Sequence, residues 1–177
     1  MNCWRTVNVK KEYDPYRLML LSLSVMVATF IFSYLIFSFR ANETVLMELG
    51  MLDTLLLFLL TIPLHTMLHL LPLKFSGVRI QTRLTRKPFI ALTFTKPIHR
   101  NVYIFSLIFP NLLITAGAFL LIFSFPAYMH YFLFIFSINA GLAVHDYVYF
   151  KQLITAPKHA LVDRRQNGMD ILVKQPV

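Results

Sequence analysis

The sequence contains few charged residues, and acidic residues are fewer than basic ones. Charged residues make up 14% of the 177 residues, with 8 acidic against 17 basic side chains. Soluble domains usually carry about a quarter charged residues, so the chain is not an ordinary soluble domain. Because 57% of its residues are hydrophobic, it is not a disordered chain either. The single cysteine, Cys3, excludes a disulfide framework and a zinc site made of several cysteines.

What the sequence does contain is long apolar runs. A membrane-spanning helix needs about 20 consecutive residues that are mainly apolar. Four stretches satisfy this length, at residues 18–39, 54–73, 102–125 and 127–150, and the charge within them is confined to Asp146. We therefore predict an all-α membrane protein, in which residues 1–177 form a single membrane domain with four transmembrane helices.

The basic residues are distributed unevenly between these spans. Arg40 is the one cation of 17 that falls between the first two spans, where it is accompanied by Glu43, Glu48 and Asp53. The others precede the first span, separate the second from the third, or follow the fourth. Cytoplasmic segments carry the excess of Lys and Arg, so we predict a multi-pass protein of the cell membrane with both termini cytoplasmic. The charge then indicates attraction to anionic inner-leaflet lipids rather than to nucleic acid.

The predicted cytoplasmic segment at residues 74–101 contains strand-forming sequence. Residues 78–84 alternate apolar and polar side chains, and residues 89–94 are rich in strand formers. This pattern predicts a short, basic β-hairpin at the cytoplasmic face. In the cytoplasmic tail, residues 151–177, the run Ile171-Leu172-Val173 predicts a further strand, which would pair with the hairpin or with residues 6–9.

Three ionisable side chains lie at the same predicted depth in the second and fourth spans. His65 and His69 are four residues apart, so that on a helix they share one face. His69 precedes Lys74 by five residues, and Asp146 precedes Lys151 by five. Two histidines and a carboxylate with an open position form a catalytic type of zinc site. The same residues would also fit a polar clamp without metal, in which Asp146 pairs with a protonated histidine.

Two neighbours of Asp146 on the fourth span extend this cluster. Asn139 precedes Asp146 by seven residues, which places it on the same helix face two turns deeper. It could hydrogen-bond across helices or orient a metal ligand by hydrogen-bonding to it. His145 points about 100° away from Asp146, and would either reach the interface or approach the site.

Taken together, these motifs resemble a family of small multi-pass bacterial membrane proteins of unknown function that are described as "putative zincin peptidases". The resemblance covers most of the chain and rests on the following elements in order: His65-Thr66-Met67-Leu68-His69, the basic strand-forming loop, Pro110, the small-residue stretch from Asn139 to Asp146, Pro157 to Ala160, Asp163 and Gly168. The resemblance implies a zinc site made of His65, His69 and Asp146.

The sequence departs from the family pattern at the position that matters most for catalysis. The family's usual motif is His-Glu-x-x-His, and Thr66 stands here in place of the glutamate. In zincins that glutamate takes a proton from the attacking water and later protonates the leaving amine, which threonine cannot do at neutral pH. The three glutamates of the chain, Glu12, Glu43 and Glu48, all lie outside the spans. Losing a general base costs about 10²–10⁴ in rate, so we assign no catalytic residue and expect an inactive relative of the peptidases.

Three functions remain open on the sequence alone. The first is a zincin-like membrane protein without peptidase activity that binds or stabilises another membrane protein. The second is an active zinc metallopeptidase that cuts a membrane-anchored substrate near the cytoplasmic face, with His145 as an unusual base. The third is a small transporter subunit that uses the two histidines and Asp146 as a proton relay, which would require an oligomer.

Overall fold

Four long helices dominate the computed structural model, which describes residues 2–7, 14–39, 45–78, 80–84, 90–94, 96–165 and 168–173. They are α2 (Pro15–Ser38), α3 (Met51–Leu68) with its continuation α4 (Leu70–Phe75), α5 (Arg100–Ser124) and α6 (Met129–Ile154). A short 3₁₀ turn, η1 (Pro126–Tyr128), joins the last two. All four are long and apolar enough to cross a membrane, which confirms the predicted architecture.

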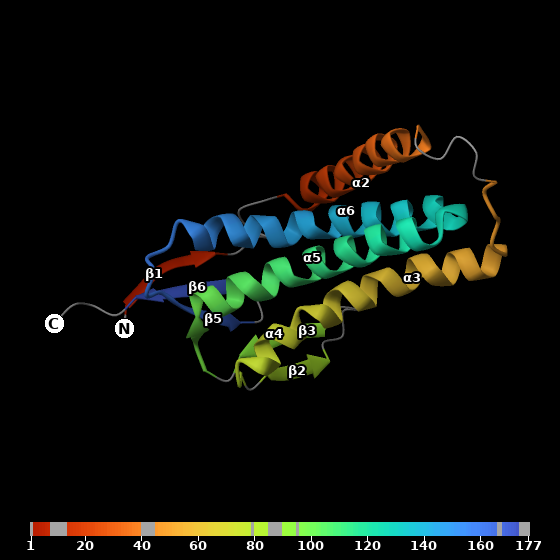
Figure 1. Cartoon of the computed structure of the whole chain (residues 1–177). Helices are drawn as coiled ribbons and strands as arrows, with labels where there is room; N and C mark the ends of the chain where they lie inside the picture. Colours follow the sequence, from red (N-terminus) through yellow and green to blue (C-terminus); the bar gives the residue numbers. More distant parts are fainter. Residues whose placement is uncertain are drawn as a thin grey trace.

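Helix α6 is the centre of the bundle. It lies between α2 on one side and α5 on the other, and α3 packs beside α5 and α6 (Figure 1). The ring of Phe134 on α6 contacts Phe30 of α2 and Phe58 of α3, at centroid distances of 5.4 and 4.3 Å. Such aromatic contacts add to the dispersion energy that holds helices together in lipid, where no hydrophobic effect operates between them.

Local sequence explains where these helices begin and bend. Asp14 caps α2, because its Oδ1 accepts a hydrogen bond from Tyr16 N at 3.1 Å and Pro15 follows at the first helical position. His99 caps α5 in the same way through Asn101 N at 3.3 Å. Pro72 lacks the N–H that would bond to Leu68 O. The helix is interrupted nearby, at His69, which separates α3 from α4. His69 keeps helical backbone angles at this junction, and Met51–Phe75 as a whole is long enough for the predicted second span.

Two small antiparallel sheets lie at the end of the bundle that also carries both chain termini (Figure 1). The predicted hairpin is confirmed as β2 (Ile80–Leu84) paired with β3 (Ile90–Phe94). It is shorter than the segment 74–101, because α4 runs to Phe75 and α5 begins at Arg100. The second sheet has four strands.

The four-stranded sheet joins distant parts of the chain. Strand β6 (Gly168–Val173) contains the predicted strand 171–173 and pairs with β1 (Asn2–Val7) and with β5 (Leu161–Arg165), which in turn pairs with β4 (Ile98–His99). Of the two partners considered for the tail, the N-terminal segment is the one observed; residues 8–9 of that predicted partner lie outside the described residues. Strands β4 and β5 were not predicted.

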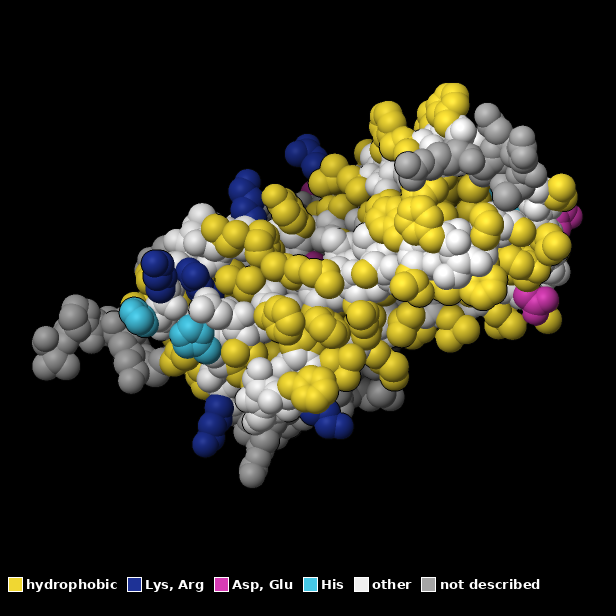
Figure 2. Space-filling view, viewed as in Figure 1, with side chains coloured by type: hydrophobic (Ala, Val, Ile, Leu, Met, Phe, Trp, Pro, Cys, Tyr) yellow, Lys and Arg dark blue, Asp and Glu magenta, His cyan; other side chains and the backbone are white. Residues whose placement is uncertain are grey.

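The larger buried core lies where this sheet meets the helices. It includes Leu73 of α4, Tyr103 of α5, Leu153 of α6 and the sheet residues Val162 and Ile171. Most of the remaining surface of the helices is apolar, as expected of helices that face lipid (Figure 2). On the face shown in Figure 2, Lys and Arg gather on the half with the sheets, and acidic side chains show most clearly at the opposite end.

Candidate metal centre

The structure brings the three predicted ligands together between α3 and α6. His65 Nε2 lies 3.0 Å and His69 Nε2 lies 3.3 Å from the same atom, Asp146 Oδ2. The exposed fractions of the side chains are 6% for His65, 14% for His69 and 18% for Asp146. The cluster is thus mostly buried, with a partial opening on the side of His69 and Asp146.

A chain of side-chain hydrogen bonds orients His65. Its Nδ1 lies 2.8 Å from Asn139 Oδ1, and Asn139 Nδ2 lies 2.9 Å from Asn111 Oδ1 on α5 and 3.4 Å from the Asn111 carbonyl oxygen. A backbone carbonyl only accepts hydrogen bonds, so the Asn139 amide points its nitrogen towards Asn111 and its oxygen towards His65. His65 therefore donates from Nδ1. The prediction that Asn139 bonds across helices and supports a ligand is consistent with this arrangement.

Backbone and side chain of one residue orient His69. His69 Nδ1 donates to the carbonyl oxygen of Ser106 at 2.7 Å, and Ser106 Oγ donates to the carbonyl oxygen of His69 at 2.7 Å. Since the acceptor is a carbonyl, the proton of a neutral His69 ring sits on Nδ1. The two rings are close to perpendicular, at 82°, with centroids 5.0 Å apart.

These bonds leave three acceptor atoms facing one another. With Nδ1 protonated, the Nε2 atom of each neutral histidine carries a lone pair, and an ionised carboxylate has only lone pairs to offer. Three lone pairs converging in a buried site repel one another unless a proton or a cation lies among them. Histidine ligands in zinc proteins typically donate their other ring N–H to a carbonyl or carboxylate, as both histidines do here.

The distances from the two histidines to Asp146 Oδ2 are close to those expected around zinc. In a tetrahedral site with ligands about 2.0–2.1 Å from the metal, neighbouring ligand atoms are about 3.3–3.4 Å apart, and the two distances to Asp146 Oδ2 are 3.0 and 3.3 Å. All three candidate ligand atoms lie within 4.8 Å of one another, and among the described residues this is the one such group of His, Cys, Asp and Glu. Nitrogen and carboxylate donors also match the preference of zinc.

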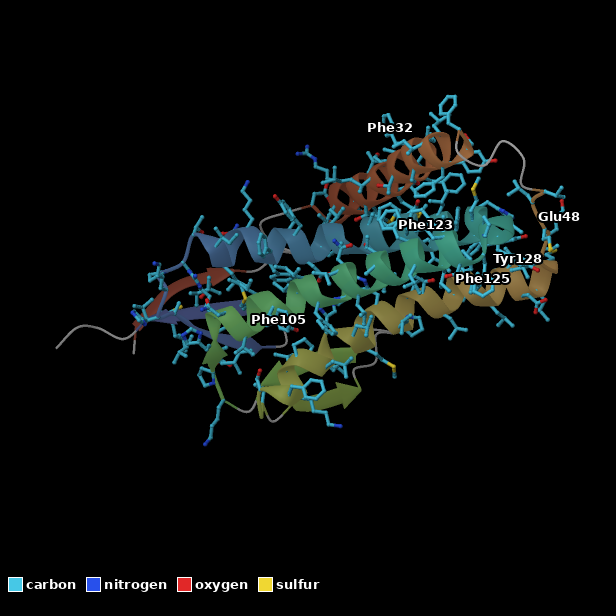
Figure 3. All side chains as sticks on the ribbon, viewed as in Figure 1. Phe32, Glu48, Phe105, Phe123, Phe125 and Tyr128 are labelled. Atoms are coloured by element: carbon cyan, nitrogen blue, oxygen red, sulfur yellow. The ribbon has the colours of Figure 1, made fainter. Side chains whose placement is uncertain are left out.

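The remaining predicted site residues lie outside this group. Thr66 is exposed, and its hydroxyl donates to Ile62 O of its own helix at 3.0 Å. His145 is exposed on α6 beside Asp146. Glu48, the glutamate within the described residues, lies at the end of the bundle opposite the sheets (Figure 3).

Sequence reasoning missed the two residues of α5 that support the site, Ser106 and Asn111. Serine and asparagine are uncharged, and both lie in a span that contains no Asp, Glu, Lys, Arg or His. One signal could have found Asn111, since an amide in the middle of a predicted span needs a partner in lipid. The role of Ser106 depends on its carbonyl, which residue type does not reveal.

The fold and the cluster together define a four-helix membrane protein with a two-histidine, one-carboxylate centre between its helices. The chain belongs to the family described as "putative zincin peptidase", whose model matches residues 58–161 and so includes all three candidate ligands. No curated protein and no solved structure gave a significant match to the chain.

Proposed function

We propose that this protein is a zinc-binding, zincin-like membrane protein that does not cleave peptides and instead binds or stabilises another membrane protein. The single observation that carries the proposal is the convergence of His65 Nε2 and His69 Nε2 on Asp146 Oδ2 at 3.0 and 3.3 Å, with both Nδ1 protons engaged elsewhere. A metal-free clamp explains this arrangement less well, because a shared proton satisfies one of the two lone pairs and leaves the other.

His65, His69 and Asp146 would hold the ion, and Asn139 and Ser106 would keep the histidine rings in place. Zinc bound in such a site acts as a Lewis acid that polarises a bound oxygen. Peptide cleavage also needs a group that accepts and returns a proton. Thr66 occupies the position of that group and has its hydroxyl bonded to Ile62 O, so the centre lacks this function and its remaining role is structural or in binding.

The proposal includes an orientation. The end of the bundle with both sheets and both termini would face the cytoplasm, because it carries the basic residues on the face shown in Figure 2 and cytoplasmic segments are enriched in Lys and Arg. The metal centre would then lie towards the cytoplasmic side of the membrane. The same basic end would contact anionic lipid headgroups.

The test is the metal content and the peptidase activity of the detergent-purified protein. We expect about one zinc per chain by elemental analysis, close to none in His65→Ala, and no chelator-sensitive cleavage of fluorescein-labelled casein by the wild type. Thr66→Glu should keep the zinc and gain cleavage over Thr66→Gln, which has the same size without the carboxylate. A wild type without zinc, or with cleavage that a chelator abolishes, would contradict the proposal.

One observation favours a second candidate, an active membrane metallopeptidase. The exposed fractions of 14% for His69 and 18% for Asp146 leave the cluster partly open, as a centre that admits a substrate must be. The exposed His145 beside Asp146 would then act as base on a membrane-anchored substrate. In that case the wild type should cleave peptides, and His145→Ala should abolish this cleavage while keeping zinc. The non-catalytic proposal expects no cleavage by either protein.

A further inference from the structure

Helix α5 supplies none of the three candidate ligands, yet it contacts His69 directly and His65 through Asn139. We propose that Pro110 is a positioning residue of the metal centre: by removing one backbone N–H it frees the Ser106 carbonyl to accept the Nδ1 proton of His69. This inference rests on the proposed zinc site, but it can be tested in the metal-free protein.

The helical hydrogen-bond pattern gives the first step. In an α-helix the N–H of each residue bonds to the carbonyl oxygen four residues earlier, so the partner of Ser106 O would be the N–H of residue 110. Residue 110 is proline, which has no N–H, and it lies inside α5. Both Pro110 and Ser106 are almost fully buried. A buried carbonyl that lacks its helical N–H donor needs another hydrogen-bond donor.

His69 is that donor, and Ser106 holds it at two points. His69 Nδ1 lies 2.7 Å from Ser106 O, and Ser106 Oγ donates to His69 O at 2.7 Å. His69 stands at the junction of α3 and α4, where the helical pattern is already broken before Pro72. His69 and Ser106 therefore form a reciprocal pair of hydrogen bonds, and Pro110 leaves the Ser106 carbonyl free to take part in it.

The hydrogen bond from His69 Nδ1 to Ser106 O determines the tautomer of His69, and therefore whether its Nε2 presents a lone pair to Asp146. A neutral histidine carries its proton on Nδ1 or on Nε2. Without an acceptor at Nδ1, the ring would place the proton on Nε2 and donate it to Asp146 Oδ2, 3.3 Å away. That tautomer forms a clamp and offers no lone pair to a metal. With Ser106 O available, Nδ1 keeps the proton and Nε2 remains a ligand.

The chain offers a matched control in Pro63, which lies inside α3. By the same pattern Pro63 frees the carbonyl of Leu59, and both residues are exposed. Pro63→Ala thus removes a proline from the middle of a membrane helix without touching the centre. Ser106→Ala separates the two bonds, because it removes the hydroxyl that donates to His69 O but keeps the carbonyl that accepts from His69 Nδ1.

The experiment measures the tautomer of His69 by ¹⁵N NMR in the metal-free protein, assigned by comparison with His69→Gln, together with zinc affinity by competition with a chelating dye. We expect Nδ1–H in wild type, Pro63→Ala and Ser106→Ala. Pro110→Ala should shift His69 towards Nε2–H and weaken zinc binding about 10–100-fold, as for other losses of outer-shell support. Pro63→Ala should leave the affinity unchanged.

Two results would overturn the inference. One is Nε2–H at His69 in the metal-free wild type, a measurement that does not depend on any variant folding. The other is a Pro110→Ala protein with the wild-type tautomer and affinity. If the wild type binds no zinc, the proposed function fails, but the tautomers of wild type and Pro110→Ala still decide the role of Pro110.

Discussion

Nδ1 of His65 on α3 and Oδ1 of Asn139 on α6 lie 2.8 Å apart, and Asn139 has no exposed surface. A buried amide between two helices is costly unless all of its groups are paired. Here the amide oxygen serves His65 and the amide nitrogen serves Asn111, so a single side chain connects α3, α5 and α6. The first prediction about the centre depends on this connection.

Replacing Asn139 with leucine should weaken zinc binding about 10–100-fold, because His65 loses the acceptor that holds its Nδ1 proton and its ring orientation. The measurement is a competition titration of the purified variant. Ser137→Ala is a suitable control, since Ser137 is equally buried on α6 but donates only to Leu133 O of its own helix. Equal affinities in the two variants would show that Asn139 does not support the site.

Replacing Asp146 with asparagine should abolish zinc binding and at the same time raise the stability of the metal-free protein by about 1 kcal/mol. An amide nitrogen at the position of Oδ2 would donate to the two Nε2 lone pairs, and a satisfied hydrogen bond contributes about 0.5–1.5 kcal/mol. The measurement is thermal unfolding in detergent with a chelator present. A metal-free clamp predicts the opposite sign, because the variant would lose a paired charge.

Adding a side chain at Gly141 should separate α2 from α6. A Cβ there would lie 3.0 Å from Ser22 O and 3.1 Å from Met26 Cβ, and overpacking of this kind costs about 1–3 kcal/mol. Gly141→Ala should therefore lower the unfolding temperature in detergent. At Gly117 of α5 a Cβ meets nothing within 4 Å, so Gly117→Ala should be neutral or stabilising by up to about 1 kcal/mol. Equal effects at both glycines would contradict this packing.

The proposed orientation can be tested with the one cysteine of the chain. Cys3 is exposed near the end that carries the sheets, so a membrane-impermeant maleimide should label it only after cells are permeabilised. A Cys3→Ser protein with Glu48→Cys provides the matched control, because Glu48 is exposed at the opposite end (Figure 3). That variant should be labelled in intact cells. The reverse pattern would place both termini outside.

Sequence alone was sufficient to predict the membrane helices, the hairpin and the three residues of the cluster. Long uncharged runs are unfavourable in water, and ionisable side chains within such runs are costly in lipid unless they pair with one another inside the protein, so both features restrict the alternatives strongly. The distance of His69 from Lys74 and of Asp146 from Lys151 then placed both at one depth. The threonine at position 66, where the family resemblance predicts a glutamate, was also visible without coordinates.

Only the tertiary structure decided how the cluster is completed. The contacts of Ser106 and Asn111 with the site depend on which faces of α5 meet α4 and α6. The residue type of an uncharged polar side chain in a span does not predict which residues it will contact. The break of the helix at His69 and the pairing of β1 with β6 likewise depend on packing between segments far apart in the chain. Residue type and spacing limit what can lie at a given depth in the membrane, whereas hydrogen-bond partners are chosen when the helices pack together.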